Sequence, residues 1–331
     1  MKRAAVDRHV IRRFARVRVL VVGDLIADEF IYGRIDRVSR EAPVLILSYG
    51  ATEVLPGGAG NAASNAAALG AKVAVVGVVG KDAVGTRMIE ALPPRANVRG
   101  IVRPTGYVTP VKTRILAGGV HSAKQQVVRI DRAGGPLTAN VVRAFDARLA
   151  RAVRRADVVV VSDYGAGLVT PDRWRRAIAS VGSKPPIVLV DSRYGLTGFR
   201  GMTACTPNES EVEALLGVSI GDDRAALERA GRTLLQQLQC QAVLITRGSR
   251  GMALFEPDRP TDHIPIVGFD QVADVTGAGD TVIATFALGL AAGASFADAA
   301  RLANYAGGLV VMKRGTATVS ADELLAATAS E

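Results

Sequence analysis

Short valine-rich runs, separated by longer stretches with helical spacing, constrain the fold of this chain more than any other feature. They occur at residues 17–22, 73–79, 158–161, 187–190 and 242–246, and each is bounded by charge or glycine. Continuous apolar strands that alternate with helices are typical of a parallel sheet covered on both faces. With right-handed crossovers, this pattern predicts a doubly wound α/β domain whose ligands bind outside the carboxyl ends of the strands.

Two segments depart from this rhythm. In residues 29–50 and 107–131, apolar and polar residues alternate more as in half-exposed strands. The second segment contains a Gly118-Gly119 turn between two half-apolar runs. We expect them to form a small sheet that stands off a single main domain covering residues 1–331. Because an exposed strand edge needs covering, this sheet is expected to be a lid over a ligand or the contact of a homodimer.

Composition narrows the class of partner. The formal net charge of +10 is compatible with nucleic acid, an acidic membrane surface or an anionic small substrate. Aromatic residues make up 5% of the chain and do not interleave with its basic clusters. This argues against nucleic-acid binding, because proteins that bind single-stranded nucleic acid need aromatic side chains on which the bases stack. No stretch reaches the roughly 18 apolar residues of a membrane span. Cys205 and Cys240 lack metal or redox spacing, so we expect reduced thiols in a cytoplasmic protein.

A glycine turn precedes an apolar helix at "DVTGAGD", residues 274–280. Gly277, Ala278 and Gly279 let the backbone fold tightly, so that several N–H groups and the positive end of the helix converge on one anion. In phosphoryl transfer such a site stabilises the moving phosphoryl group, and Asp280 beside it can accept the proton of an attacking hydroxyl. A simple helix cap explains Asp280 equally well.

A second glycine turn leads into a helix of small residues at "PGGAGNAASNAAALGA", residues 56–71. Close helix packing would account for it. Alternatively, the backbone at Gly57 and Gly58 approaches a polyhydroxyl ligand, to which Asn61 offers both a donor and an acceptor. Asp28 and Asp163 each lie just past a predicted strand, where a carboxylate either caps a turn or faces the ligand cleft.

In their order and spacing, the two glycine turns and the segment after the first predicted strand resemble motifs of the ribokinase-like (PfkB) carbohydrate kinases. The resemblance runs from about Val17 to the C-terminus. "TPNESEVEALLG" and "LITRGSRGM" also resemble motifs of that family. The resemblance implies an ATP- and Mg²⁺-dependent sugar kinase, with Asp280 as catalytic base, Gly277 to Gly279 as anion hole, and Asp28 and Asn61 on the sugar hydroxyls. It places Glu211 near Mg²⁺ through water. The residues that it places around the nucleotide are Asn208, Glu211, Thr246, Gly248, Gly251 and Asn304. In parts of the family a monovalent cation such as K⁺ binds near the positions of Asp274 and Thr276.

Residues 23–44, "GDLIADEFIYGRIDRVSREAPV", resemble the subgroup of kinases in lipopolysaccharide heptose synthesis. That likeness implies transfer to O1 of D-glycero-β-D-manno-heptose 7-phosphate, giving the 1,7-bisphosphate for ADP-heptose synthesis. A kinase of another sugar or sugar phosphate, such as fructose 1-phosphate or ribose, is the alternative. Many relatives carry a nucleotidyltransferase domain after the kinase, and this chain ends at Glu331, so we expect the stand-alone form.

A substrate that already carries phosphate needs a cationic receiver. The two lid segments offer four candidates: Arg37, Lys112, Arg114 and Arg129. The planar guanidinium group of arginine can donate two hydrogen bonds to phosphate oxygens. Alternatively, alternating basic residues serve only to protect edge strands from pairing with another chain.

Overall fold

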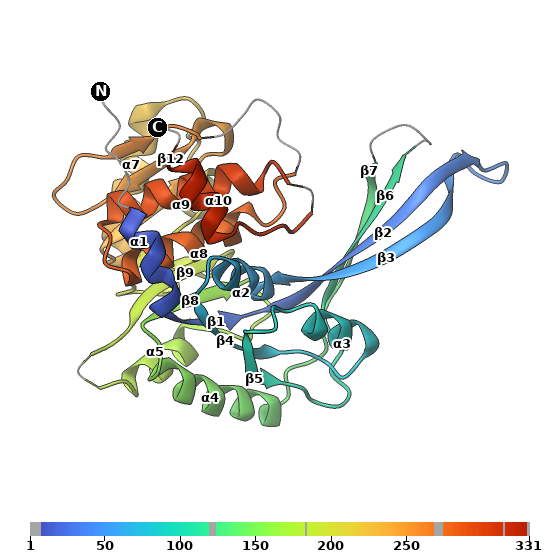
Figure 1. The fold of residues 1–331 in the computed structure, drawn as a ribbon, viewed down its shortest axis with the longest axis horizontal. Coiled ribbons are helices and arrows are strands. Elements are labelled where there is room, and N and C mark those ends of the chain that lie inside the picture. Colours follow the sequence, from blue (N-terminus) through green and yellow to red (C-terminus); the bar gives the residue numbers. More distant parts are fainter. Residues whose placement is uncertain (1–7, 119–123, 183, 268–273, 314, 330–331) are drawn as a thin grey trace.

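The computed structural model describes residues 8–118, 124–182, 184–267, 274–313 and 315–329. In this part of the chain, nine strands form the main sheet in the order β13-β12-β11-β10-β9-β8-β1-β4-β5 (Figure 1). Neighbouring strands pair in parallel along the part of this sheet that runs β11-β10-β9-β8-β1-β4-β5. Strands β12 and β13 extend it in antiparallel pairing. Their bounds are β1 Arg18–Gly23, β4 Lys72–Val78, β5 Asn97–Val102, β8 Val158–Asp163, β9 Ile187–Ser192, β10 Ala204–Cys205, β11 Ala242–Thr246, β12 Met252–Phe255 and β13 Asp262–Ile264.

Helices cover both faces of this sheet, which confirms the predicted doubly wound α/β fold (Figure 1). Because both faces are buried, β8 is apolar at every position from Val158 to Val161 and needs no alternation. One buried cluster packs under α1 Arg8–Arg13, α2 Ala59–Ala68, α8 Ala278–Ala291, α9 Phe296–Val310 and α10 Ala321–Ala327. The other packs under α4 Ala139–Val153, α5 Pro171–Ala179, α6 Glu209–Leu216 and α7 Arg224–Leu238.

Trp174 lies in the second cluster, as its position on a helix predicts. No helix in the described residues is both long enough and apolar enough to cross a membrane.

A four-stranded sheet in the described residues projects from the main domain and forms the lid (Figure 1). Its order is β3-β2-β6-β7, with β2 and β6 parallel and the outer pairs antiparallel. Its strands are β2 Leu25–Val38, β3 Leu45–Gly58, β6 Val111–Gly118 and β7 Gln125–Arg132. The first hairpin is longer than the predicted segment 29–50, because its two strands continue inward as far as β1 and α2. Helix α3, Ala83–Glu90, packs beside this inner end against β3.

The topology brings the polar ends of the central strands to one edge. β1 ends at Gly23, β8 at Asp163, β9 at Ser192 and β11 at Thr246, and these strands run in parallel. Just past β10, Asn208 forms an isolated parallel bridge to Thr246. The lid begins at the same edge, since β2 follows β1 after a single residue. Any ligand at this edge therefore lies between the main sheet and the lid.

Candidate active site

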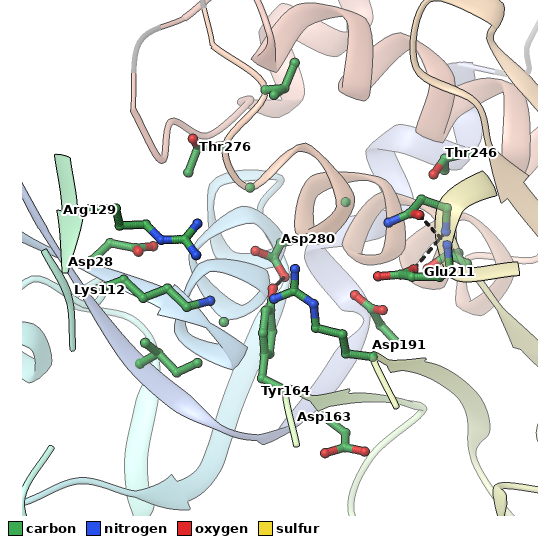
Figure 2. Close-up of a pocket in the computed structure, with 18 of the residues that line it drawn as sticks. Asp28, Lys112, Arg129, Asp163, Tyr164, Asp191, Glu211, Thr246, Thr276 and Asp280 are labelled. Carbon is green, nitrogen blue, oxygen red and sulfur yellow. Dashed lines mark hydrogen bonds between the residues drawn. The ribbon is translucent and has the colours of Figure 1, made fainter. Parts of the chain in front are cut away.

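A pocket of about 500 Å³ opens at the carboxyl edge of the main sheet. Its walls come from three sources: the inner part of the lid, the residues that follow the central strands, and the turn before α8. Figure 2 shows Asp28, Lys112 and Arg129 on one side of Asp280, and Asp191, Glu211 and Thr246 on the other. The pocket thus has a lid end and an end formed by the strands β9, β10 and β11.

Asp280 lies in the first turn of α8, at the bottom of this pocket, and is 5% exposed. One carboxylate oxygen accepts a hydrogen bond of 2.8 Å from the Asn61 amide, and the other accepts one of 3.3 Å from the Tyr164 hydroxyl. Burial raises the pKa of Asp280 to about 7, and the charge of Asp28 adds to the increase, against these hydrogen bonds and Lys112. A carboxylate with this pKa can accept a proton near neutral pH.

A buried chain of hydrogen bonds fixes the orientation of Asn61. The Asn65 amide donates to Asn61 Oδ1 at 3.1 Å, and the Thr281 hydroxyl donates to Asn65 Oδ1 at 2.9 Å. The Asn61 oxygen is therefore used as an acceptor, and its NH₂ group points to Asp280. The predicted contact of Asn61 with sugar hydroxyls stays a prediction. Asn61 is 1% exposed and does not line the pocket, because α2 packs directly against α8.

Gly277 is the N-cap of α8 and adopts φ 77°, in the left-handed region that favours glycine. A Cβ at this position would lie 2.2 Å from Asn61 Nδ2, so a side chain would also displace the partner of Asp280. Gly277 and Gly279 line the pocket, but Ala278 does not, and the Ala278 N–H donates to Val275 O at 3.3 Å.

The N–H groups available to an anion therefore differ from the predicted set of Gly277 to Gly279. The Thr281 N–H also has an acceptor, the Gly277 carbonyl at 3.2 Å. Within the described residues, the N–H groups of Gly277, Gly279 and Asp280 have no acceptor, as is usual at the start of a helix. Gly277 and Gly279 of the predicted set, together with Asp280, therefore keep an N–H group available to an anion, whereas the Ala278 N–H has an acceptor.

At the lid end, Asp28 on β2 forms an ion pair of 2.5 Å with Arg114 on β6, and both side chains are nearly buried. The pair uses Oδ1 of Asp28. On the neighbouring strand β3, a Cβ at Gly57 would be 2.2 Å from Oδ2 of Asp28, and Gly58 lines the pocket. Asp28 therefore retains one oxygen for a ligand hydroxyl, whereas the Arg114 charge is largely neutralised.

The other lid cations have different surroundings. Lys112 lies with its ammonium 4.8 Å from the centre of the Tyr164 ring, and loss of hydration lowers its pKa. Arg129 lines the pocket and forms an ion pair with Asp131. These two side chains face the pocket from β6 and β7.

Arg37 is not in the pocket, contrary to its prediction as a contact of the substrate phosphate. It pairs with Asp36, and its side chain is 67% exposed. The physical reason is distance along β2. Arg37 lies nine residues beyond Asp28, and a strand rises about 3.3 Å per residue, so the two are separated by about 30 Å.

At the opposite end of the pocket, Asn208 and Glu211 form a capping box at the start of α6. Asn208 Oδ1 accepts the Glu211 N–H, and Glu211 Oε2 accepts the Asn208 N–H, both at 2.9 Å. Both residues line the pocket together with Thr246 at the end of β11. The capping box fixes the Glu211 carboxylate while one of its two oxygens is not used in the box, which fits a role in binding metal-coordinated water.

Three residues predicted around the nucleotide do not line this pocket. Gly248 and Gly251 lie in the turn between β11 and β12. Asn304 on α9 is 3% exposed, and its amide donates to the Pro265 carbonyl at 2.7 Å. That bond ties α9 to the chain after β13, and the predicted place of Asn304 beside adenine stays a prediction.

Asp163 lines the pocket, but hydrogen bonds occupy both of its oxygens. They accept from the Gly165 N–H at 2.9 Å and from the Ser192 hydroxyl at 2.7 Å. Asp24, which follows β1, accepts the N–H groups of Tyr164 and Ala166 at 2.8 and 3.1 Å. Burial raises the Asp24 pKa to about 6. These two carboxylates therefore fix the loop that carries Tyr164.

Tyr164 and Arg193 line the pocket and were not predicted from the sequence. Each comes directly after the last residue of a central strand, β8 or β9. The rule that places ligands beyond the carboxyl ends of parallel strands could have found both.

Asp274 and Thr276 lie in the turn before α8. The Asp274 oxygens accept the N–H groups of Thr276 at 2.9 Å and of Gly315 at 3.1 Å. Thr276 lines the pocket. Asp274 therefore ties this turn to the loop after α9, and a cation near it would share a carboxylate already bonded to two N–H groups.

Comparison with known proteins agrees with this geometry. Residues 18–323 match the profile of a family described as pfkB family carbohydrate kinase. The bifunctional protein HldE of Geobacter metallireducens is 43% identical over 93% of the chain and 62% of that protein. HldE of Caulobacter vibrioides is 44% identical over 97% of the chain and 65% of that protein. The chain thus spans less than two thirds of the length of these curated relatives.

Solved structures show the same fold at low sequence identity. Arabidopsis thaliana ribokinase complexed with ribose and ATP has a TM-score of 0.72 at 22% identity, over 94% of this chain and 98% of that one. Escherichia coli phosphofructokinase-2 in complex with fructose-6-phosphate has a TM-score of 0.75 at 17% identity, over 95% and 99%. With a profile match over most of its length and relatives above 40% identity, the chain belongs to the pfkB family of carbohydrate kinases.

Proposed function

We propose that this protein transfers the γ-phosphoryl group of ATP to O1 of D-glycero-β-D-manno-heptose 7-phosphate. The observation that carries the proposal is the buried Asp280, at the start of α8 and between a cationic lid end and a polar strand end of one pocket. A base beside unpaired helix N–H groups suits transfer of an anionic group to a hydroxyl.

The reaction needs one bond to form and one to break. The sugar O1 attacks the γ-phosphorus, the bond from that phosphorus to the β–γ bridging oxygen breaks, and ADP leaves with its electron pair. Asp280 accepts the O1 proton, which its raised pKa permits near neutral pH. The N–H groups of Gly279 and Asp280 stabilise the charge of the moving phosphoryl group.

The nucleotide is proposed to bind at the strand end of the pocket, where Asn208 and Thr246 offer polar groups. The Glu211 oxygen outside the capping box can orient water on a Mg²⁺ ion. When bound, Mg²⁺ would neutralise charge on the phosphate oxygens. We also propose a K⁺ site near Asp274 and Thr276, as the resemblance to the family implies.

The proposed acceptor follows from the likeness of residues 23–44 to the heptose kinases and from the cations Lys112 and Arg129 at the lid end. Relatives named as bifunctional proteins extend well beyond the matched region, so the activity of any longer protein is a separate question. Fructose 1-phosphate and ribose are the alternative acceptors. We also propose a cytoplasmic location, because Cys205 and Cys240 are both free thiols.

A panel of sugars tests the acceptor. With the purified protein, ATP and Mg²⁺, we expect heptose 7-phosphate to give the highest kcat/KM in an ADP-release assay. The dephosphorylated heptose should be a poorer acceptor, because it lacks the charge that the lid cations receive. A higher kcat/KM with fructose 1-phosphate or ribose would contradict the proposed acceptor and leave the kinase assignment intact.

Substitution of Asp280 by asparagine should lower kcat by about 10²–10⁴-fold, because the general base is lost while the shape is kept. ATP affinity, measured by titration calorimetry, should change little. Asp172→Asn on the exposed face of α5 is the matched control and should retain full activity. Near-normal turnover by Asp280→Asn would exclude Asp280 as the base.

The pH dependence of kcat/KM should report the ionisation of Asp280. Activity requires the ionised carboxylate, so we expect it to rise with pH through about 7. Tyr164→Phe removes a hydrogen bond that favours the ionised form. The midpoint should then move to higher pH by about one unit, which corresponds to about 1.4 kcal/mol. Tyr32→Phe, on β2 and outside the pocket lining, is the control. A Tyr164→Phe midpoint that stays in place or falls would contradict this role.

We further propose that the lid forms a homodimer contact. Most of the exposed large apolar side chains of the described residues lie on its strands or tip, and contiguous exposed apolar surface is typical of interfaces. These residues are Ile35, Val38, Val44, Leu45, Tyr49, Val127, Val128 and Ile130.

Sedimentation equilibrium should therefore give twice the chain mass. Val128→Asp on β7 should shift the protein towards monomer, because it places a charge in an apolar contact. Val218→Asp is the control, since Val218 is about equally exposed but lies outside the lid. A wild-type monomer, or equal effects of the two substitutions, would argue against a lid dimer.

A further inference from the structure

The cations that line the pocket are not equivalent. In the described residues there are four: Lys112, Arg114, Arg129 and Arg193. Arg114 and Arg129 each form an ion pair with a carboxylate, and the Lys112 ammonium lies over an aromatic ring. Within the described residues, the Arg193 side chain has no hydrogen bond, ion pair or ring contact, and the residue is exposed. Its guanidinium can therefore bind a ligand without first breaking a contact.

Strand order places Arg193 at the boundary between the two ends of the pocket. Arg193 follows β9, and β9 lies between β8 and β10 in the main sheet. The residue after β8 is Tyr164, which contacts Asp280, and the chain after β10 leads to Asn208. The Arg193 N–H donates to the Asp163 carbonyl at 3.0 Å, which fixes the start of the loop. A phosphoryl group that passes from the nucleotide to the sugar must cross this boundary.

Several carboxyl groups lie at this boundary. In Figure 2, Asp191 lies between Asp280 and Glu211. Burial and the charges of Asp280 and Glu211 raise the pKa of Asp191, whereas the charge of Arg193 lowers it. The charge of Arg193 also acts on Lys112, so its field reaches both ends of the pocket. The carboxylates of Asp280 and Glu211 would repel a triphosphate, and Arg193 is the unpaired cation of the described pocket lining placed to offset that repulsion.

We propose that Arg193 is a catalytic residue that contacts the transferring γ-phosphoryl group from the side of β9, across the pocket from the N-terminus of α8. This inference rests on the proposed kinase function but not on the identity of the sugar. As the bond to O1 forms and the bond to the bridging oxygen breaks, the Arg193 fork donates hydrogen bonds to the phosphoryl oxygens. The proton still goes to Asp280, and Arg193 remains protonated throughout.

Arg193→Ala tests the proposal in steady-state assays with whichever sugar the wild-type protein phosphorylates fastest. We expect kcat to fall by about 10²–10³-fold, as when one transition-state donor is removed. The KM of the sugar and the affinity for a non-hydrolysable ATP analogue should change much less. Arg193→Lys should recover only part of the loss, because an ammonium supplies the charge but not the planar fork. Arg175→Ala, on the exposed face of α5, is the matched control and should retain wild-type kinetics.

Three results would overturn the proposal. A rise in KM confined to phosphorylated sugars, with normal kcat on unphosphorylated ones, would place Arg193 on the substrate phosphate. A lowered Tm with unchanged kcat in Arg193→Ala and in Arg193→Gln would assign it to the fold. Normal kcat in all Arg193 variants would remove it from the reaction. If the wild type acts best on a sugar other than heptose 7-phosphate, the acceptor proposal fails, and the Arg193 test is run on that sugar.

Discussion

The hydrogen bond between Asn61 and Asp280 is the interaction on which the geometry of the site depends. It joins α2 to α8 across 219 residues of sequence and connects the two glycine turns. Asp280 is nearly buried, and a buried carboxylate is costly unless it is hydrogen-bonded. The Asn61 amide satisfies one oxygen and so lets the carboxylate remain near the pocket with a pKa close to neutrality.

Buried small residues make this contact possible. Helix α2 packs against α8 and carries buried alanines such as Ala62 and Ala66, and small side chains allow helices to approach closely. Gly277 has no side chain to displace Asn61. Asn65 and Thr281 then orient the Asn61 amide, so that its NH₂ group rather than its oxygen faces Asp280. A run that reads as simple close packing therefore also positions the proposed base.

The lid depends on a second buried contact, the ion pair between Asp28 and Arg114. It joins the parallel strands β2 and β6 where the lid meets the main sheet, and the pair has little access to solvent. An isolated buried charge would be strongly unfavourable there, so each member needs the other. Asp28 lines the pocket, and a hydroxyl bound to its carboxylate would contact the base of the lid directly. Beyond this point the lid is more exposed, and Arg37 is too far along β2 to reach the same pocket.

The sequence by itself determined the α/β class, the position of the central strands, the separate small sheet and the turn that carries Asp280. These features follow from local pattern, because apolar runs, glycine turns and helix starts are encoded within a few neighbouring residues. Tertiary structure alone decided the partners of each polar side chain. The Asn61 amide donates to Asp280, the Asn304 amide donates to the Pro265 carbonyl, and the Arg193 side chain lines the pocket with no partner among the described residues. Such outcomes depend on which distant elements pack together, and a sequence pattern carries no distance between residues that are far apart along the chain.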